Sequence, residues 1–141
     1  MSRARSRARH AAVQALYQWQ LSHQDVQDIE QQFLTEQDMK RVEVPYFQEL
    51  LQQIPRRLAE LDNYLGPLLD RPLPEVDPVE RAILRIGAYE LGFRPDVPYR
   101  VVINEAVETA KLFGGEEGYK YVNSILDKLA RKLRKTEMKK T

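Results

Sequence analysis

The chain has 141 residues, of which 43% are hydrophobic and 30% charged, enough apolar material for one domain or two small subdomains that share a core. Its 22 basic and 21 acidic residues give a formal charge of +1, which excludes attraction of a polyanion by net charge alone. The absence of cysteine excludes disulfides, thiolate metal sites and a cysteine nucleophile. It favours a reducing, cytoplasmic location.

Charge is distributed unevenly along the chain. Residues 1–10 carry four arginines and no acidic residue, residues 11–100 carry nine basic and fifteen acidic residues, and residues 101–141 carry nine and six. An acidic body with two basic ends suggests local contacts with an anionic partner. No apolar run approaches the roughly 20 residues needed to span a bilayer, so no membrane partner is expected. The apolar periodicity that follows the first ten residues favours a helix of the domain over a secretory signal or a transit peptide.

Apolar residues at helical spacing predict four helices in the first half of the chain. They cover about residues 5–22, 25–34, 45–54 and 58–68. The stripe of the first consists of Val13, Leu16, Tyr17 and Leu21. Pro55 predicts a break or kink between the third and fourth helices. Three prolines within residues 71–78 predict the boundary between two subdomains, about 1–71 and 78–135, with a short basic tail at 136–141.

Three more helices are predicted in the second half. Asp77 and Pro78 suit the N-cap and first turn of a helix that ends near Gly92. A further helix is closed by Gly114 and Gly115, and a last one runs through residues 122–133. No segment shows the sustained alternation of a strand. The sequence therefore predicts an all-α fold of about seven helices in two small subdomains.

Nothing in the sequence makes a case for catalysis, a metal or a cofactor. His10 and His23 lack partners at metal-ligand spacing and are expected at the surface. The glycine-rich segment 114–118 follows a predicted helix and lacks the Lys-Ser/Thr of a phosphate-binding loop. The many carboxylates show no spacing that isolates a general acid and base.

The N-terminal arginines are the sharpest local feature. Arg3, Arg5, Arg7 and Arg9 alternate with small residues. On a helix, Arg3 and Arg7 share one side while Arg5 and Arg9 share roughly the opposite side, whereas in an extended chain all four point the same way. Either geometry can meet an RNA backbone through bidentate phosphate contacts. The alternative is a solvated terminus that only aids solubility.

Two further charged regions also have two interpretations. Basic side chains surround the polar side of the last helix, with Tyr119 and Tyr121 at its start, a combination that can hold phosphates and stack on bases. The same cations can simply complement the helix dipole. These basic residues are Lys120, Lys128, Arg131, Lys132, Arg134 and Lys135. In the fifth helix, a set of charges flanks the apolar stripe and is expected to be solvated, with a protein-partner surface as the alternative. This set is Glu80, Arg81, Arg85 and Glu90.

Three segments taken together resemble the NusB family of bacterial transcription antitermination proteins. They are SRARSRARHAAVQALYQWQ, DPVERAILRIGAYEL and DVPYRVVINEAVETAKLFGGEEGYKYVNSILDKL. The resemblance runs from the N-terminus to about Leu129. It implies an all-helical fold of two subdomains and an RNA-binding factor without enzymatic activity. Such factors pair with NusE, a small-subunit ribosomal protein, and the pair recognises the boxA element of nascent RNA. With other Nus factors, the pair helps RNA polymerase pass terminators, chiefly on ribosomal RNA operons.

The resemblance also implies which residues form the site. The RNA-binding residues are Arg3, Arg5, Arg7 and Arg9 in the first helix, and Glu117, Lys120 and Tyr121 at the start of the last. Tyr17 is expected beside either RNA or NusE, and Glu80 is expected on the side that faces NusE. Two positions depart from the family: Gly118 replaces a small hydroxyl residue, and Ser124 replaces a frequent glycine. Losing a capping hydroxyl is expected to weaken the start of the last helix by about 1 kcal/mol.

Two other function classes compete with an RNA-binding antitermination factor. NusB-like domains also occur fused to ribosomal RNA methyltransferases, but this chain ends shortly after its last predicted helix and has no glycine-rich cofactor loop. The third class is a protein scaffold or a self-associating dimer whose basic ends only keep it in solution. Light scattering distinguishes that dimer from a monomer.

Overall fold

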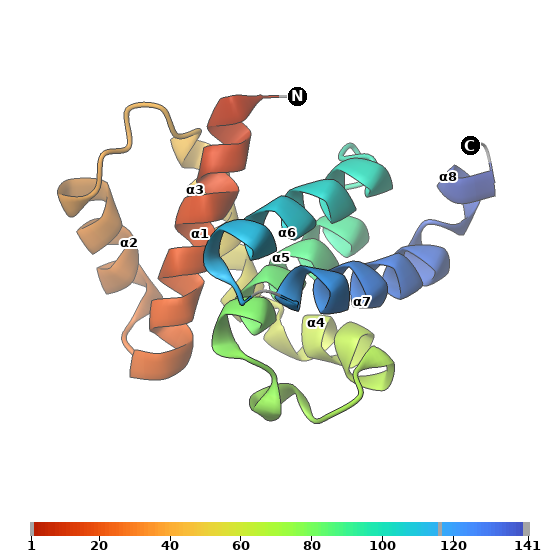
Figure 1. Cartoon of the computed structure of the whole chain (residues 1–141). Coiled ribbons are helices and arrows are strands. Elements are labelled where there is room, and N and C mark those ends of the chain that lie inside the picture. Colours follow the sequence, from red (N-terminus) through yellow and green to blue (C-terminus); the bar gives the residue numbers. More distant parts are fainter. Residues whose placement is uncertain (1, 116, 140–141) are drawn as a thin grey trace. The chain divides into compact units, whose positions relative to one another are not determined.

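A computed structural model describes residues 2–115 and 117–139, and these residues form eight α-helices and two 3-10 helices without a β-strand (Figure 1). The predicted all-α class is confirmed, and the seven expected helices are joined by a short eighth. In chain order the α-helices are α1 (Arg3–Ser22), α2 (Val26–Glu36), α3 (Val44–Arg56), α4 (Leu58–Leu65), α5 (Pro78–Phe93), α6 (Tyr99–Phe113), α7 (Gly118–Leu133) and α8 (Lys135–Lys139).

The chain divides into two compact units, Met1–Arg57 and Leu58–Thr141, which we call the N-terminal and C-terminal units. The division falls just after Pro55, at the predicted break: α3 ends one residue past this proline, and α4 begins at Leu58. The proline-rich segment 71–78 lies inside the C-terminal unit, because α4 on one side of it packs against α5 on the other. The boundary that the sequence predicts at residues 71–78, between subdomains of about 1–71 and 78–135, stays a prediction.

In the N-terminal unit, α1 packs against both α3 and α2 (Figure 1). Small residues of α1 permit close packing, and the largest fully buried side chains of the unit come mainly from α3. The core of the unit includes Ala8, Ala12, Leu16, Ile29, Phe33, Tyr46, Phe47, Leu50 and Ile54. Ser2 and Asp25 cap α1 and α2 by accepting hydrogen bonds from backbone N–H groups. α1 ends at Ser22, and its C-cap residue His23 adopts the left-handed conformation with φ of 58°.

The predicted apolar stripe of α1 is only partly correct. Val13 and Leu16 are buried, but Tyr17 is 38% exposed and Leu21 is 51% exposed. The buried side of α1 is completed by the alanines, whose small size gives a weak signal in a hydrophobic pattern. Tyr17 and Leu21 therefore lie on a solvent-facing side of this helix.

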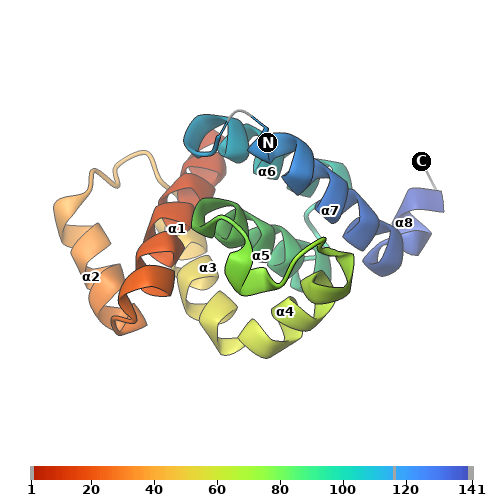
Figure 2. The same cartoon turned by 60° about the horizontal axis from the view of Figure 1, so that its bottom comes forward.

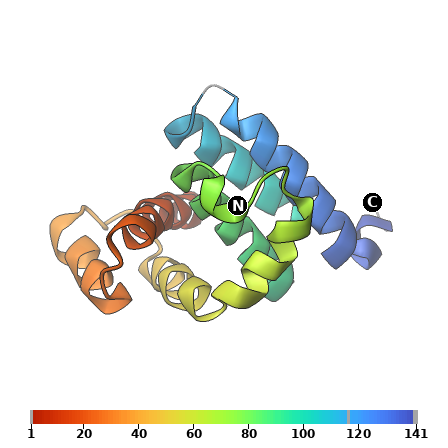
Figure 3. The same cartoon turned by 90° about the horizontal axis from the view of Figure 1, so that it is seen from below.

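α5 is the central helix of the C-terminal unit, because it packs against α4, α6 and α7. α6 and α7 run side by side in Figures 1 and 3, and Figure 2 shows the segment with the 3-10 helices Gly66–Leu68 (η1) and Leu73–Glu75 (η2) that leads from α4 to α5. The Asp77 carboxylate accepts hydrogen bonds from the backbone N–H groups of Val79 and Glu80, as predicted for the N-cap of α5.

The expectation that the charges of α5 are solvated is wrong for Arg85 and Glu90. Every residue of α5 from Ala82 to Leu91 is buried. Arg85 makes a bidentate pair with Asp62 of α4, with both N–O distances at 3.0 Å. A helix enclosed on most sides must place some polar residues inside, and each then needs a partner.

Arg134, expected among the basic residues of the polar side of the last helix, is also buried. It is 7% exposed, and its guanidinium donates to the backbone carbonyls of Glu90, Leu91, Arg94 and Val97. These carbonyls belong to the C-terminal end of α5 and the turn that follows it, where a helix leaves its acceptors unsatisfied. The Glu137 carboxylate of α8 pairs with the same guanidinium. Arg134 therefore fastens the end of α7 to the end of α5.

Candidate nucleic-acid interface

The arginines at the N-terminus lie on α1, which begins at Arg3. The Ser2 hydroxyl accepts a hydrogen bond from the Arg5 backbone N–H at 3.3 Å, so the run is helical and not extended. Helical geometry places Arg3 and Arg7 on one side and Arg5 and Arg9 on another. The two pairs have different surroundings.

Arg5 and Arg9 lie against α3. The Arg5 guanidinium donates to both carboxylate oxygens of Glu43 at 3.2 and 2.8 Å, and its carbon lies 4.2 Å from the centre of the Tyr46 ring. Arg9 is 3% exposed and lies 5.5 Å from the centre of the same ring. These contacts stabilise the packing of α1 on α3. In this structure Arg9 presents almost no surface to a ligand, and Arg5 is already paired.

Arg3 and Arg7 have no ion-pair partner among the residues that the structure describes. Arg3 is exposed and Arg7 is half-exposed. Tyr17 follows Arg3 by fourteen residues, about 3.9 turns of a helix, and Arg7 by ten, about 2.8 turns, so the three side chains fall within roughly 80° around the helix axis. Arg3, Arg7 and Tyr17 thus form one side of α1, which we call the α1 face. The guanidinium groups of Arg3 and Arg7, with no ion-pair partner in the described part of the chain, and the exposed Tyr17 ring suit contacts with phosphates and bases.

The second candidate surface lies at the start of α7 in the C-terminal unit. The Lys120 ammonium pairs with the Glu117 carboxylate at 2.8 Å, and both side chains are largely exposed. Glu117 is the N-cap residue but makes no side-chain capping bond. The Tyr119 ring lies 4.9 Å from the Lys111 ammonium and 6.0 Å from that of Lys120. Cations and aromatic rings are therefore adjacent here, as the sequence suggested.

Tyr121 is joined to the segment between α4 and α5. Its hydroxyl donates to Asp70 at 3.0 Å, and the Arg71 guanidinium lies 5.1 Å from the centre of its ring. Arg71 also makes a bidentate pair with Asp70 at 2.8 and 3.0 Å. The hydrogen bonds from Arg71 and Tyr121 hold the pKa of Asp70 below its usual value. Partial burial and the neighbouring Asp70 carboxylate raise the pKa of Tyr121.

Glu80 lies beside the first residue of α7. A side-chain carbon on Gly118 would come within 2.9 Å of a Glu80 carboxylate oxygen. Burial raises the pKa of Glu80, and the nearby Asp77 raises it further, while Arg71 acts in the opposite direction. The residue predicted to face a protein partner is therefore close to those predicted to contact RNA at the start of α7.

Sequence reasoning did not single out Asp70 or Arg71. A consecutive acid and base in a proline-rich segment carry no signal of their own. Their connection with Tyr121 spans 51 residues, which no spacing rule covers. Arg9 was singled out as a residue of the site but is buried, because its position in a basic run gave no sign of burial.

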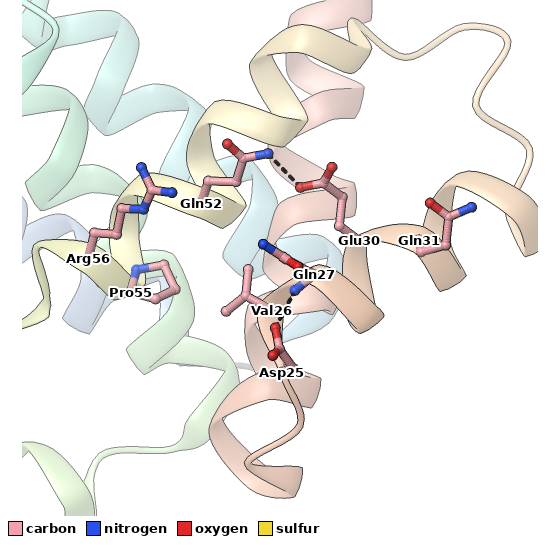
Figure 4. Close-up of a pocket in the computed structure, with 8 residues that line it drawn as sticks. All are labelled: Asp25, Val26, Gln27, Glu30, Gln31, Gln52, Pro55 and Arg56. Atoms are coloured by element: carbon pink, nitrogen blue, oxygen red, sulfur yellow. Dashed lines mark hydrogen bonds between the residues drawn. The ribbon is translucent and has the colours of Figure 1, made fainter.

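A polar cleft of about 590 Å³ lies between α2 and α3 of the N-terminal unit (Figure 4). Its polar groups largely satisfy one another: the Glu30 carboxylate accepts hydrogen bonds from Gln52 at 2.7 Å and Gln48 at 3.2 Å. Asp25 accepts the capping bond from the Gln27 backbone N–H at the edge of the cleft. Across residues 2–115 and 117–139, no group of three or more acidic or histidine side chains could hold a metal ion. None of the described helices is both long and apolar enough to cross a membrane.

The structure thus defines an all-helical protein whose two units each present basic and aromatic side chains. The model of the NusB family matches residues 6–131. The chain is 60% identical over 139 residues to the transcription antitermination protein NusB of Nitrosococcus oceani, covering 99% of this chain and 93% of that protein. It is 58% identical over 133 residues to the transcription antitermination protein NusB of Marinobacter nauticus, covering 94% of this chain and 84% of that protein. A solved structure of T. maritima NusB superposes with a TM-score of 0.84 at 32% identity, over 99% of both chains.

The chain belongs to the NusB family of transcription antitermination proteins. The resemblance found in the sequence is confirmed, as is the predicted NusB-like fold. The family is non-enzymatic, so the expectation that this chain is not an enzyme is also confirmed. The residues that bind RNA or a partner stay predictions.

Proposed function

We propose that the chain binds boxA-type single-stranded RNA as a heterodimer with the ribosomal protein NusE. Through other Nus factors and RNA polymerase, this complex promotes read-through of terminators, chiefly on ribosomal RNA operons. The α1 face supports the proposal most strongly, because in an antitermination protein it offers two guanidinium groups without an ion-pair partner among the described residues. Tyr17, on the same face, is 38% exposed and can contact either the RNA or NusE.

On the α1 face, Arg3 and Arg7 contact phosphates, and the Tyr17 ring stacks on a base or contacts the partner. At the start of α7, Lys120 contacts a phosphate and the Tyr121 ring stacks on a base, once the Lys120 ammonium exchanges the Glu117 carboxylate for that phosphate. Glu117, freed from Lys120, contacts the RNA beside them. Because Glu117 and Lys120 are exposed, their ion pair costs little to break. Arg5 and Arg9 support the RNA contacts indirectly, since they hold α1 on Tyr46.

Glu80 supplies the contact with NusE. A carboxylate whose pKa is raised by burial gains most from a cationic partner that restores the lost interactions of the charged form. The excess of acidic residues between positions 11 and 100 suits a basic ribosomal protein. Two weak RNA-binding surfaces on joined proteins then act as one tighter site through effective concentration. Sequence specificity comes from unpaired bases, because phosphate contacts carry no sequence information.

Amide chemical-shift mapping of the ¹⁵N-labelled chain with a boxA-type RNA tests the proposed surface. We expect shifts to concentrate at residues 2–9 and 117–122 and to leave the cleft between α2 and α3 unchanged. Shifts confined to other segments would refute the assignment. Pull-down of the Glu80→Gln variant with NusE tests the partner contact. Glu75→Gln is the control, because Glu75 is an exposed acidic residue of η2, five residues before Glu80. Equal capture of NusE by both variants would exclude a role for Glu80.

A further inference from the structure

We propose that Asp70 and Arg71 form a clasp over Tyr121 in the RNA-free protein, and that Arg71 is a further RNA-contacting residue released from Asp70 when RNA binds. The inference rests on the proposed RNA-binding function and adds a competing contact within the same surface. The clasp consists of Asp70, Arg71 and Tyr121.

The geometry shows that the clasp occupies the groups that RNA would use. The Arg71 guanidinium lies 5.1 Å from the centre of the Tyr121 ring, where a base would stack. Asp70 accepts from Arg71 at 2.8 and 3.0 Å and from the Tyr121 hydroxyl at 3.0 Å. One carboxylate thus holds both the cation and the ring. The 3-10 helix η1, which precedes Asp70, packs against α7, so this segment is held near Tyr121.

The charges of the clasp oppose RNA in its closed form. Asp70 neutralises Arg71 and places a carboxylate where a phosphate would approach, and Glu80 also acts on Arg71 electrostatically. When Arg71 turns from Asp70 to a phosphate, the guanidinium keeps its bidentate geometry with a new anion. It can also remain stacked beside the aromatic ring as a base arrives.

The clasp can open readily because it lies at the surface. The side chains of Arg71 and Asp70 are 46% and 61% exposed, and exposed ion pairs are weak and screened by salt. A buried pair such as Arg85–Asp62, in which the arginine side chain is 9% exposed, would not exchange partners in this way. The exposed position therefore suits a contact that RNA displaces.

The test compares two variants by fluorescence anisotropy with a labelled boxA-type RNA at two salt concentrations, in the presence of NusE. Asp70→Asn removes the competing charge but keeps an oxygen for the Tyr121 hydroxyl, and we expect it to bind RNA about threefold more tightly. Arg71→Ala loses a phosphate contact, so it binds more weakly and its log–log salt slope is shallower by about 0.7, the value for one contact with a single strand.

The matched control is the Arg94–Asp96 pair, which has the same bidentate geometry at 2.9 and 2.8 Å. Arg134, the C-cap of α7, donates to the Arg94 carbonyl, so this pair lies near the opposite end of a helix about 24 Å long. Asp96→Asn measures the effect of the lost charge alone and should change RNA affinity much less than Asp70→Asn. Circular dichroism verifies that every variant is folded.

The outcomes separate this inference from the proposed function. If the unmodified chain does not bind RNA with NusE, the proposed function fails and the clasp fails with it. If the unmodified chain binds but Asp70→Asn binds no more tightly than Asp96→Asn, only the clasp is refuted. An unchanged salt slope in Arg71→Ala refutes the RNA contact of Arg71.

Discussion

The N-terminal arginines should separate into a pair that acts on RNA affinity and a pair that acts on stability. In an Arg3→Ala/Arg7→Ala variant, two phosphate contacts are lost but no ion pair among the described residues is broken. Each contact with a single strand contributes about 0.7 to the log–log salt slope, so the slope becomes shallower by about 1.4. Between 50 and 200 mM salt, the unmodified chain then loses roughly sevenfold more affinity than this variant.

Arg9→Ala should instead destabilise the N-terminal unit. Arg9 is 3% exposed and lies over Tyr46, itself 2% exposed. Removing the side chain loses a desolvated cation–π contact and leaves a gap beside the ring, at a cost of about 2 kcal/mol. For a chain of this size that corresponds to a fall of roughly 8 °C in Tm.

The assays are fluorescence anisotropy for RNA affinity and thermal unfolding followed by circular dichroism for stability. The expected pattern is an altered salt slope at an unchanged Tm for Arg3→Ala/Arg7→Ala, and a lowered Tm for Arg9→Ala. The reasoning is refuted if the double variant keeps the full salt slope. It is equally refuted if Arg9→Ala keeps its Tm while losing RNA affinity, because Arg9 would then be the residue that contacts RNA.

Three other predictions concern the C-terminal unit. In Gly87→Ala the new carbon would lie 2.6 Å from Leu126 Cδ1. Overpacking should outweigh the gain in helix propensity and lower the free energy of unfolding, measured by urea titration, by about 1 kcal/mol. A more stable variant would show that Leu126 repacks freely. Arg134→Ala removes the guanidinium bonds to four backbone carbonyls, of which those of Glu90 and Arg94 keep a backbone N–H donor. It should cost about 3 kcal/mol in the same assay, and a loss under 1 kcal/mol would contradict the role of Arg134 in holding α7 to α5. Because the folded pKa of Glu80 is raised above its usual value near 4.5, the fold loses stability as the pH rises from about 4.5 through the folded pKa. Glu80→Gln should therefore be the more stable protein at pH 7, and it should lose this advantage as the pH falls through the folded pKa to about 4.5. Equal unfolding curves for Glu80→Gln and the unmodified chain at pH 7 would count against that burial effect.

The helices were predictable because their signals are local. Asp77 and Pro78 begin α5 as expected, and Pro55 marks the end of α3. Apolar spacing also placed the other main helices. What it does not reveal is how many sides of a helix are covered. α5 is enclosed by three neighbours, so Arg85 and Glu90 became buried although the pattern suggested a solvated side.

The candidate site was predictable only where one helix carries it. The helical alternation that divides Arg3 and Arg7 from Arg5 and Arg9 follows from the sequence, but which pair would face Tyr46 depends on the packing of α3. The clasp of Asp70, Arg71 and Tyr121 joins residues far apart in the chain. Periodicity describes one element at a time, so contacts between elements, and the pairing state of a charged residue, require the folded structure.

The most direct test of the central claim is an anisotropy titration of the full chain with a boxA-like RNA and a scrambled RNA of the same length, with and without NusE, at two salt concentrations. The account predicts that NusE tightens binding to the boxA-like RNA only, and that higher salt weakens it. If neither RNA binds under any of these conditions, the basic side chains do not form an RNA-binding surface, and the proposed function is contradicted.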